Sequence, residues 1–203
     1  MLNQTELCEL AMKYGTDKCP QICHDYTPVY FELFNAHRNK IKTVVEMGIG
    51  TRKYRTRIFG RTVEVGERID VKPKLGGSLK MWRDFFPNAT IYGADIEPEC
   101  LFEDERIKTY ICDETNKESI RAWIEEIGED IDIFIDDGSH KRKDQILLAK
   151  VVLPFMAKGS FYVIEDVDHP EIVREHFKEY HLWEPTLREL PSKYKNSLMI
   201  IYP

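Results

Sequence analysis

The sequence lacks the features of a membrane-spanning, secreted or nucleic-acid-binding protein. None of its apolar runs approaches the roughly 20 residues that a helix needs to cross a bilayer. Segment 1–9 contains acidic residues and no basic stretch ahead of an apolar one, so no signal peptide is expected. The net charge of −6 and the pI near 5.6 argue against a general nucleic-acid binder. We therefore expect a cytoplasmic protein whose partners include neither a membrane nor a nucleic acid.

Paired cysteine motifs are absent as well. The five cysteines are an odd number and form no C-x-x-C pair. Cys19 and Cys23, with the adjacent His24, could supply part of a zinc site, but no second pair of ligands completes it. Free thiols in a reducing cytosol are the better interpretation. With 203 residues the chain can bury a substantial core without disulfides, and we expect a single domain over 1–203.

What the sequence does contain is an alternation of apolar strand-like runs and amphipathic segments. Two helices, at 2–14 with Thr5 as its N-cap and at 28–38, precede the first strand and predict an N-terminal helical cap over 1–40. Later helices are expected at 79–86, 117–127, 143–153 and 170–180. Strands are expected at 42–50, 89–95, 106–111, 131–136, 160–164, 182–187 and 197–202.

This alternation predicts the fold class. Strands separated by helices form a mainly parallel sheet with helices on both faces. Residues 158–159 are expected to turn into the fifth strand, and the last two strands are joined by a loop short for a helical crossover. The prediction is an α/β, Rossmann-like, doubly wound, seven-stranded sheet with an antiparallel last strand, occupying 41–203.

Two of the expected strands end abruptly in acids. Asp137 follows the apolar run 131–136, and Glu165 and Asp166 follow the run 160–164. If the two strands are parallel neighbours, these carboxylates converge at one rim of the sheet, with His140 one turn away. Such a cluster is costly unless a cation neutralises it, and oxygen ligands favour Mg²⁺ first and Mn²⁺ or Ca²⁺ next. The alternative is that the acids are helix N-caps or solvated strand ends.

A glycine turn and two further acids point to a nucleotide-like ligand. Gly48 and Gly50 follow the first strand, where glycine lets the backbone approach a ligand closely. Asp95 ends the second strand, in position to accept hydrogen bonds from a ribose diol. Asp113, after the third strand, is placed either to contact an adenine amino group or to cap the helix at 117–127.

The first two strands are separated by a basic insertion at 51–75. Its cations, against the acids Glu64, Glu67 and Asp70, are Arg52, Lys53, Arg55, Arg57, Arg61, Arg68, Lys72 and Lys74. A solvated surface excursion explains such a composition, and so does a clamp for an anionic ligand. On the second interpretation Arg55 and Arg57 are candidate substrate contacts, and a phosphate-bearing substrate is favoured.

Six motifs together resemble one family. They are Lys13 to Lys18 (KYGTDK), Val45 to Gly50 (VEMGIG), the segment from Gly77 to Ala89, Ile91 to Ile96 (IYGADI), Asp137 to His140 (DGSH), and Ile164 to Asp166 (IED). In this order they resemble the class I S-adenosylmethionine-dependent methyltransferases. More closely, the chain is similar to the metal-dependent sugar O-methyltransferases of antibiotic biosynthesis, of the macrocin and rhamnosyl types, and to the cephalosporin-hydroxylase group.

The resemblance implies roles for particular residues. Asp137, Glu165 and Asp166 would hold Mg²⁺ (or Mn²⁺), and His140 would act as the base. The implied contacts to S-adenosylmethionine are Tyr14, Glu46, Gly48, Gly50, Ser78, Asp95, Ile96, Asp113 and Asp136. Tyr14, Asp17, Lys18, His24 and Tyr26 would form a lid or an ordinary capped loop, and His24 and Tyr26 are also candidate substrate contacts.

The implied activity is S-adenosylmethionine- and Mg²⁺-dependent methylation of a hydroxyl on a sugar, a sugar phosphate or a nucleotide-linked small molecule. This activity would serve natural-product or surface-polysaccharide biosynthesis. One candidate acceptor is a phosphorylated or phosphoramidate modification of a capsule. Two alternatives come from other classes. An NAD-dependent Rossmann oxidoreductase would use Asp95 but would normally show a third glycine and leaves the acid cluster unexplained. A non-catalytic S-adenosylmethionine-binding protein needs no metal. Assembly into a homo-oligomer stays open.

Overall fold

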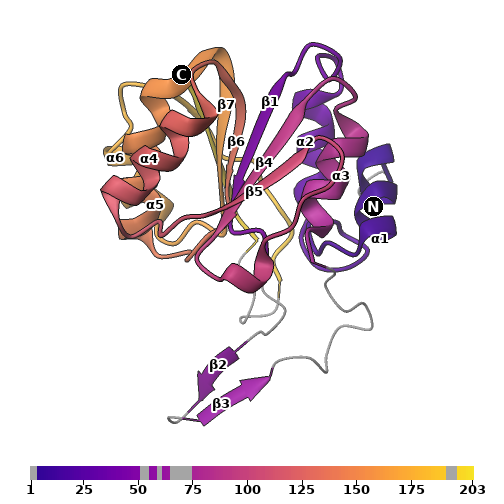
Figure 1. Ribbon diagram of the computed structural model, residues 1–203, viewed down its shortest axis with the longest axis horizontal. Coiled ribbons are helices and arrows are strands. Elements are labelled where there is room, and N and C mark those ends of the chain that lie inside the picture. Colours follow the sequence, from indigo (N-terminus) through magenta and orange to yellow (C-terminus); the bar gives the residue numbers. More distant parts are fainter. Residues whose placement is uncertain (1–3, 51–54, 59–60, 65–74, 191–195) are drawn as a thin grey trace.

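The computed structural model describes residues 4–50, 55–58, 61–64, 75–190 and 196–203. Its main element is a seven-stranded sheet in the order β5-β4-β1-β6-β7-β9-β8 (Figure 1). The strands of this sheet are β1 (Thr43–Met47), β4 (Thr90–Asp95), β5 (Ile107–Ile111), β6 (Ile131–Asp136), β7 (Met156–Glu165), β8 (His181–Trp183) and β9 (Leu198–Tyr202).

The pairing confirms the predicted fold class. The pairs β1–β4, β4–β5, β1–β6 and β6–β7 are parallel, whereas β9 runs antiparallel to both of its neighbours, β7 and β8. The chain leaves β1 toward β4 and β5 and then returns to the other side of β1 with β6. This reversal of direction is a topological switch point, where open α/β sheets bind ligands beyond the carboxyl ends of their strands.

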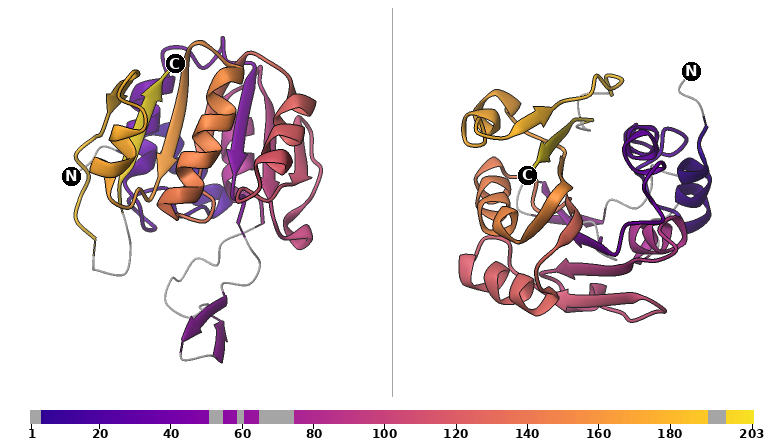
Figure 2. Two further views of the ribbon diagram at one scale, coloured as in Figure 1. Left: turned by 90° about the vertical axis from the view of Figure 1, so that its left-hand side faces the viewer. Right: turned by 90° about the horizontal axis from the view of Figure 1, so that it is seen from above.

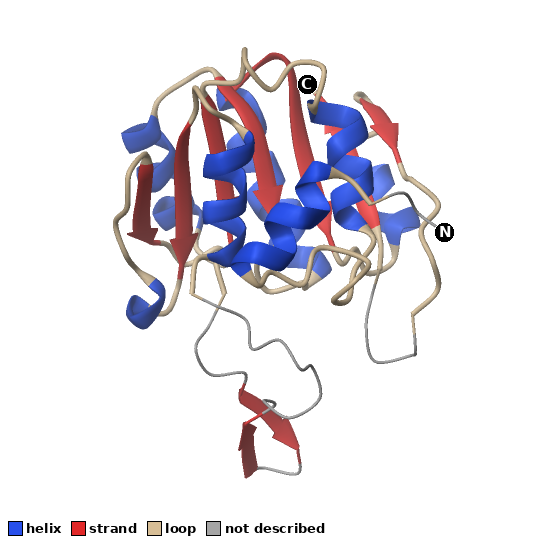
Figure 3. Ribbon diagram, turned by 90° about the vertical axis from the view of Figure 1, so that its right-hand side faces the viewer, coloured by secondary structure: helices blue, strands red, loops and turns tan. Residues whose placement is uncertain are grey.

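Helices cover both faces of the sheet (Figures 1 and 2). One layer contains α1 (Glu6–Tyr14), α2 (Tyr26–Phe34) and α3 (Gly77–Phe85), and Figure 3 views the sheet from this side. The other layer contains α4 (Lys117–Ile127), α5 (Arg142–Val152) and α6 (Pro170–Glu175). Short 3₁₀ turns occur at Pro98–Cys100 and Leu153–Phe155.

The side chains of each central strand divide between two cores. In β1, Val44 packs into the core under α1, α2 and α3, while Val45 packs into the core under α4 and α5. Both side chains are fully buried, because successive residues of a strand point to opposite faces and both faces are covered. This explains why the strands read as continuous apolar runs in the sequence.

Several predicted boundaries need correction. Residues 158–159 do not turn into the fifth strand, because β7 already begins at Met156 and continues through them. The pairing of β6 with β7 is irregular there, and Gly159 adopts φ 78°, so the sequence signal for a turn marks a bulge. The second helix is Tyr26–Phe34 rather than 28–38, and α6 ends at Glu175 rather than near 180. The Thr5 cap of α1 is confirmed, since its side chain accepts from Cys8 N.

The basic insertion is described only in part. Residues 55–58 and 61–64 form β2 (Arg55–Ile58) and β3 (Arg61–Glu64), which pair antiparallel. The side chains of both strands, including Arg55 and Arg57, lie outside the described part of the chain, as do 51–54 and 65–74. Within the described segments, no helix combines the length and apolar composition needed to span a lipid bilayer.

The start of α4 is capped by Asn116 and not by Asp113. The Asn116 side chain accepts a hydrogen bond from Ser119 N at 3.0 Å, whereas the Asp113 carboxylate accepts from Thr115 N and Thr115 Oγ1. Asn116→Ala should therefore lower the free energy of unfolding by about 1 kcal/mol, measured by urea denaturation. Asn116→Asp keeps a hydrogen-bond acceptor at the cap and should therefore retain most of this free energy. Equal losses of stability in both variants would contradict the cap assignment.

Candidate active site

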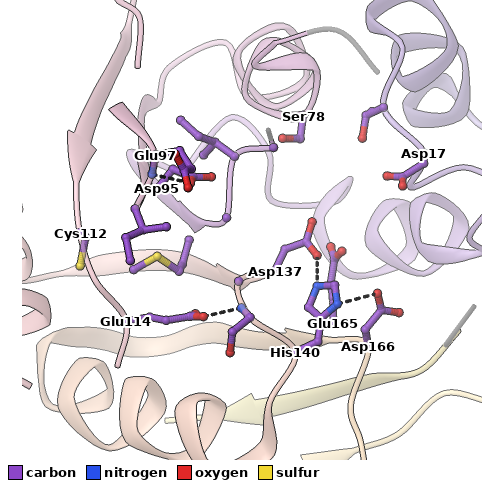
Figure 4. Close-up of a pocket in the computed structure, with 18 of the residues that line it drawn as sticks. Asp17, Ser78, Asp95, Glu97, Cys112, Glu114, Asp137, His140, Glu165 and Asp166 are labelled. Atoms are coloured by element: carbon purple, nitrogen blue, oxygen red, sulfur yellow. Dashed lines mark hydrogen bonds and ion pairs between the residues drawn. The ribbon is translucent and has the colours of Figure 1, made fainter. Parts of the chain in front are cut away.

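A cavity of about 790 Å³ opens at the carboxyl ends of β1, β4, β5, β6 and β7 (Figure 4). Its wall is built from the turns that follow these strands, the start of α3 and the loop after α1. A volume of this size is typical of a small-molecule site. The predicted residues in its wall are Asp17, Lys18, His24, Gly48, Gly50, Ser78, Asp95, Ile96, Asp113, Asp137, His140, Glu165 and Asp166.

The turn after β1 lies against the turn after β6. Asp137 N donates to Met47 O at 2.9 Å, and a Cβ added at Gly48 would lie 1.9 Å from Asp137 O. Gly48 also has φ 83°, so glycine is required there both by conformation and by contact. Gly50 has φ 92°, but a Cβ there would meet nothing within 4 Å. The first glycine therefore lets two site loops touch, and the second leaves open space beside the cavity.

These two glycines make a matched pair of variants. Gly50→Ala should cost about 1–2 kcal/mol of stability, because only the left-handed backbone is strained. Gly48→Ala should cost on the order of 1–3 kcal/mol more, because the Asp137 turn must also move. Chemical denaturation measures both. Equal losses would show that the close contact between the turns contributes nothing.

The predicted acids converge, and a lysine lies among them. Lys18 Nζ is 2.5 Å from Asp137 Oδ2, 2.6 Å from Glu165 Oε2 and 3.6 Å from Glu46 Oε1, and its side chain is 2% exposed. Burial lowers the pKa of this ammonium, but the three carboxylates outweigh that effect and hold the pKa well above its usual value. Lys18 is therefore a permanent internal cation, which the sequence suggested only as part of a lid.

His140 bridges two of the acids on the cavity side. Its Nε2 lies 3.0 Å from Asp137 Oδ1 and its Nδ1 lies 3.5 Å from Asp166 Oδ2 (Figure 4). Burial lowers the pKa of His140, but the hydrogen bond and the charge of Asp137 dominate and raise it to about 9. For Asp137, burial raises the pKa, but Lys18 and His140 bring it down to about 2.

Tyrosines hold the two acids at the end of β7, Glu165 and Asp166. Tyr30 OH donates to Glu165 Oε1 and Tyr26 OH donates to Asp166 Oδ1, each at 2.5 Å. Both oxygens of Glu165 are thus occupied, one by Tyr30 and one by Lys18. Tyr26, predicted as a substrate contact, therefore lies behind Asp166 and not in the cavity wall.

The site residues present a donor set suited to a hard divalent cation. Asp137, His140 and Asp166 each offer one ligand atom, and these atoms lie within 4.8 Å of one another. The carboxylate oxygens of Asp137 and Asp166 suit Mg²⁺ or Mn²⁺, whereas an imidazole is more often a ligand of metals such as zinc and iron. Glu165, the third predicted ligand, adjoins this group, but its oxygens are already paired as described.

On the opposite side of the cavity lie the residues predicted to bind the cosubstrate. Asp95 ends β4 in the wall, where its Oδ1 accepts from Glu97 N at 3.0 Å. Ile96, 57% exposed, follows it at the cavity wall, and Ser78 lies in the first turn of α3. This side of the cavity can therefore offer an acid, an exposed apolar side chain and a hydroxyl to one ligand.

Three predicted cosubstrate residues do not line the cavity. Glu46 is fully buried and accepts from Trp82 Nε1 at 2.6 Å. Tyr14 donates its hydroxyl to Asp84 on α3. Asp136 is fully buried, 3.4 Å from Tyr162 OH, and burial raises its pKa to about 8. The alternation of side chains along β6 explains Asp136, because Asp136 points to one face while Asp137, in the turn, faces the site.

Three lining carboxylates, Glu97, Glu99 and Glu114, were missed from the sequence, and Glu114 is the one tied to the candidate metal-binding turn. Glu114 accepts a hydrogen bond from Ser139 N, and its Oε2 occupies the position where a Cβ on Gly138 would be. The turn after β5 is thereby tied to the turn that carries Asp137 and His140. Glu114 falls in a polar loop next to Asp113, and nothing in its local sequence distinguishes it.

The chain resembles known methyltransferases in sequence and in structure. It is 32% identical over 161 residues to a rhamnosyl tetracenomycin-C 2'-O-methyltransferase of Streptomyces olivaceus, and 34% identical over 162 residues to a demethylmacrocin O-methyltransferase of Streptomyces fradiae. The matches cover 79% and 80% of this chain but only 37% and 36% of those proteins. No protein-family model matches the chain.

A solved structure of MycE, a methyltransferase of mycinamycin biosynthesis in complex with Mg and SAH, matches with a TM-score of 0.72 and 25% identity. The match covers 99% of this chain and 55% of that one. By fold and by these relatives, the chain is similar to the class I S-adenosylmethionine-dependent methyltransferases. Within that class it is similar to the sugar O-methyltransferases of the macrocin and rhamnosyl types. The chain spans little more than a third of the length of these curated relatives.

Proposed function

We propose that this chain transfers a methyl group from S-adenosylmethionine to a hydroxyl of a sugar-containing small molecule, with a divalent cation, Mg²⁺ or Mn²⁺, as cofactor. The observation that carries the proposal is the convergence of Asp137, His140 and Asp166 at one wall of a cavity whose opposite wall holds Asp95. The relatives are sugar O-methyltransferases, and the MycE structure contains Mg and SAH.

The divalent cation would be held by Asp137 and Asp166, with Glu165 adjacent. When bound, such a cation lowers the pKa of a coordinated hydroxyl. A sugar hydroxyl is otherwise a poor nucleophile at neutral pH.

His140 is the residue placed to accept the proton. While it faces Asp137 and Asp166 alone, its pKa of about 9 keeps it protonated at neutral pH. Sharing those carboxylates with a divalent cation lowers that pKa, and the neutral imidazole can then take a proton. S-adenosylmethionine would supply the methyl group from its sulfonium and leave as S-adenosylhomocysteine, and the cavity's main contribution would be to hold both reactants in contact.

The cosubstrate would occupy the side of the cavity formed by Gly48, Gly50, Ser78 and Asp95. Asp95 would accept hydrogen bonds from the ribose diol, and Ile96 would pack on the adenine. The backbone of the Gly48 turn would approach the amino-acid end.

The acceptor is proposed by class. The relatives are named for the methylation of a rhamnosyl tetracenomycin-C and of mycinamicin VI. The basic insertion at 51–75 supports the further hypothesis of a phosphate- or nucleotide-linked sugar, from a surface-polysaccharide or capsule pathway. Cytoplasmic location follows from neither observation and stays a prediction.

Mass spectrometry tests the proposal. The chain is incubated with S-adenosylmethionine, Mg²⁺ and two acceptor panels, neutral glycosides and nucleotide sugars, and each product is examined for a mass gain of one CH₂ group. A gain that is abolished by EDTA and restored by Mg²⁺ is expected. Calorimetric binding of NAD without binding of S-adenosylmethionine would instead support the oxidoreductase alternative, and binding of S-adenosylmethionine without Mg²⁺ binding would support a non-catalytic role.

A further inference from the structure

Lys18 occupies one carboxylate of the proposed metal site, Asp137, and the adjacent Glu165. Its ammonium contacts Asp137 Oδ2 and Glu165 Oε2, and Tyr30 takes the other oxygen of Glu165. Since His140 faces Asp137 Oδ1, every oxygen of these two acids has a partner. A cation that enters here meets an ammonium already in place.

A second acceptor for the ammonium lies next to it. Glu46 Oε1 is buried without a hydrogen-bond partner, 3.6 Å from Lys18 Nζ. Its other oxygen is fixed by the indole of Trp82 at 2.6 Å. A buried carboxylate oxygen without a donor is unfavourable. A short shift of the ammonium toward Glu46 would form a hydrogen bond to Glu46 Oε1 and would weaken those to Asp137 and Glu165.

We propose that Lys18 is an internal counter-ion that binds Asp137 and Glu165 in the absence of the divalent cation and moves onto Glu46 when the cation binds. Lys18 and the cation then compete for Asp137, the carboxylate that both would contact, since like charges on one carboxylate repel. The inference rests on the metal site of the proposed function. It assigns to the KYGTDK motif and to Glu46 a role in metal exchange, in addition to any contact with the cosubstrate.

The proposal predicts two effects of Lys18→Met, measured without cosubstrate. The affinity for Mn²⁺, from electron paramagnetic resonance of the free ion, should rise on the order of tenfold, because a competing charge is removed. In chelator the variant should melt at a lower temperature than the wild type, because the buried carboxylates lose their counter-ion, and Mn²⁺ should restore the melting temperature. Lys13→Met removes an exposed lysine paired with Asp84. This control should change neither the affinity for Mn²⁺ nor the effect of Mn²⁺ on the melting temperature.

Glu46→Gln supplies the second test. It keeps the shape and a hydrogen-bond acceptor for Trp82 but removes the charge that receives Lys18. Mn²⁺ affinity should fall in the wild-type background and stay unchanged in the Lys18→Met background. Such non-additivity is expected only if Glu46 acts through Lys18.

The outcomes separate the two proposals. A wild-type chain that binds no Mn²⁺ would contradict the proposed function itself. Wild-type binding together with equal or weaker binding by Lys18→Met would overturn the counter-ion role alone. If Lys18→Met does not fold in either condition, Glu46→Gln decides: unchanged Mn²⁺ affinity overturns the proposal, and weakened affinity supports it.

Discussion

Asp137→Asn should abolish metal-dependent methyl transfer. The Asp137 carboxylate contacts both Lys18 and His140 and is a proposed ligand of the cation, so its charge is needed by all three. Asparagine keeps the shape but removes the charge and replaces one acceptor oxygen with a donor. We expect Mn²⁺ affinity to fall by at least about 10–100-fold, the range seen when even a supporting group of a metal site is lost. Titration of Mn²⁺ and the product assay measure the two effects.

The matched control lies at the opposite end of the same strand. Asp132 Oδ2 accepts from Lys42 N and Thr43 N at 2.7 and 2.9 Å, where β1 begins. Asp132→Asn should lower stability, because amide hydrogen bonds replace charge-assisted ones, but it should leave metal affinity unchanged. Retained metal binding in Asp137→Asn would show that the cation, if any, is held elsewhere.

His140→Gln should reduce kcat by about 10²–10⁴-fold, the usual contribution of a general base. Glutamine can still accept a hydrogen bond but cannot carry the proton away. Because a base works only when neutral, the wild-type rate should rise with pH through the pKa of His140 in the loaded site. That rise should be missing from the variant.

The same variant distinguishes a base from a ligand. His140 offers a nitrogen to the group formed with Asp137 and Asp166, so it could also coordinate the cation. As a base its loss leaves Mn²⁺ affinity nearly intact; a large loss of affinity would reassign it as a ligand. His169→Gln, an exposed histidine paired only with Glu171 in the described structure, should match the wild type in every measurement.

The parts of this molecule that sequence alone predicts are those with local or periodic causes. Apolar runs gave the strands, and the breaks into acids at Asp137 and Glu165 placed these residues correctly on one rim, because parallel neighbours end at the same edge. The Thr5 cap is equally local. These signals need only a few residues of context.

What sequence could not predict depends on contacts between distant segments. Lys18 meets Asp137 and Glu165 across gaps of 119 and 147 residues, and Tyr30 reaches Glu165 from α2. A lysine in a polar turn looks like a solvated residue until the fold buries it. Similarly, the Gly159 bulge reads as a turn, because both require the same backbone freedom.

The pairing of β8 at the far edge of the sheet depends on β9, which comes later in the chain. Residues 198–202 lie between β7 and β8, so β8, which precedes them in the chain, has no partner in the sheet until they arrive. Cleavage just before residue 198 would therefore free two strands rather than one and bare the backbone of β7, whose end carries Glu165. Such a cleavage would disturb the candidate active site from the edge of the sheet, because β7 would be left with an unpaired edge.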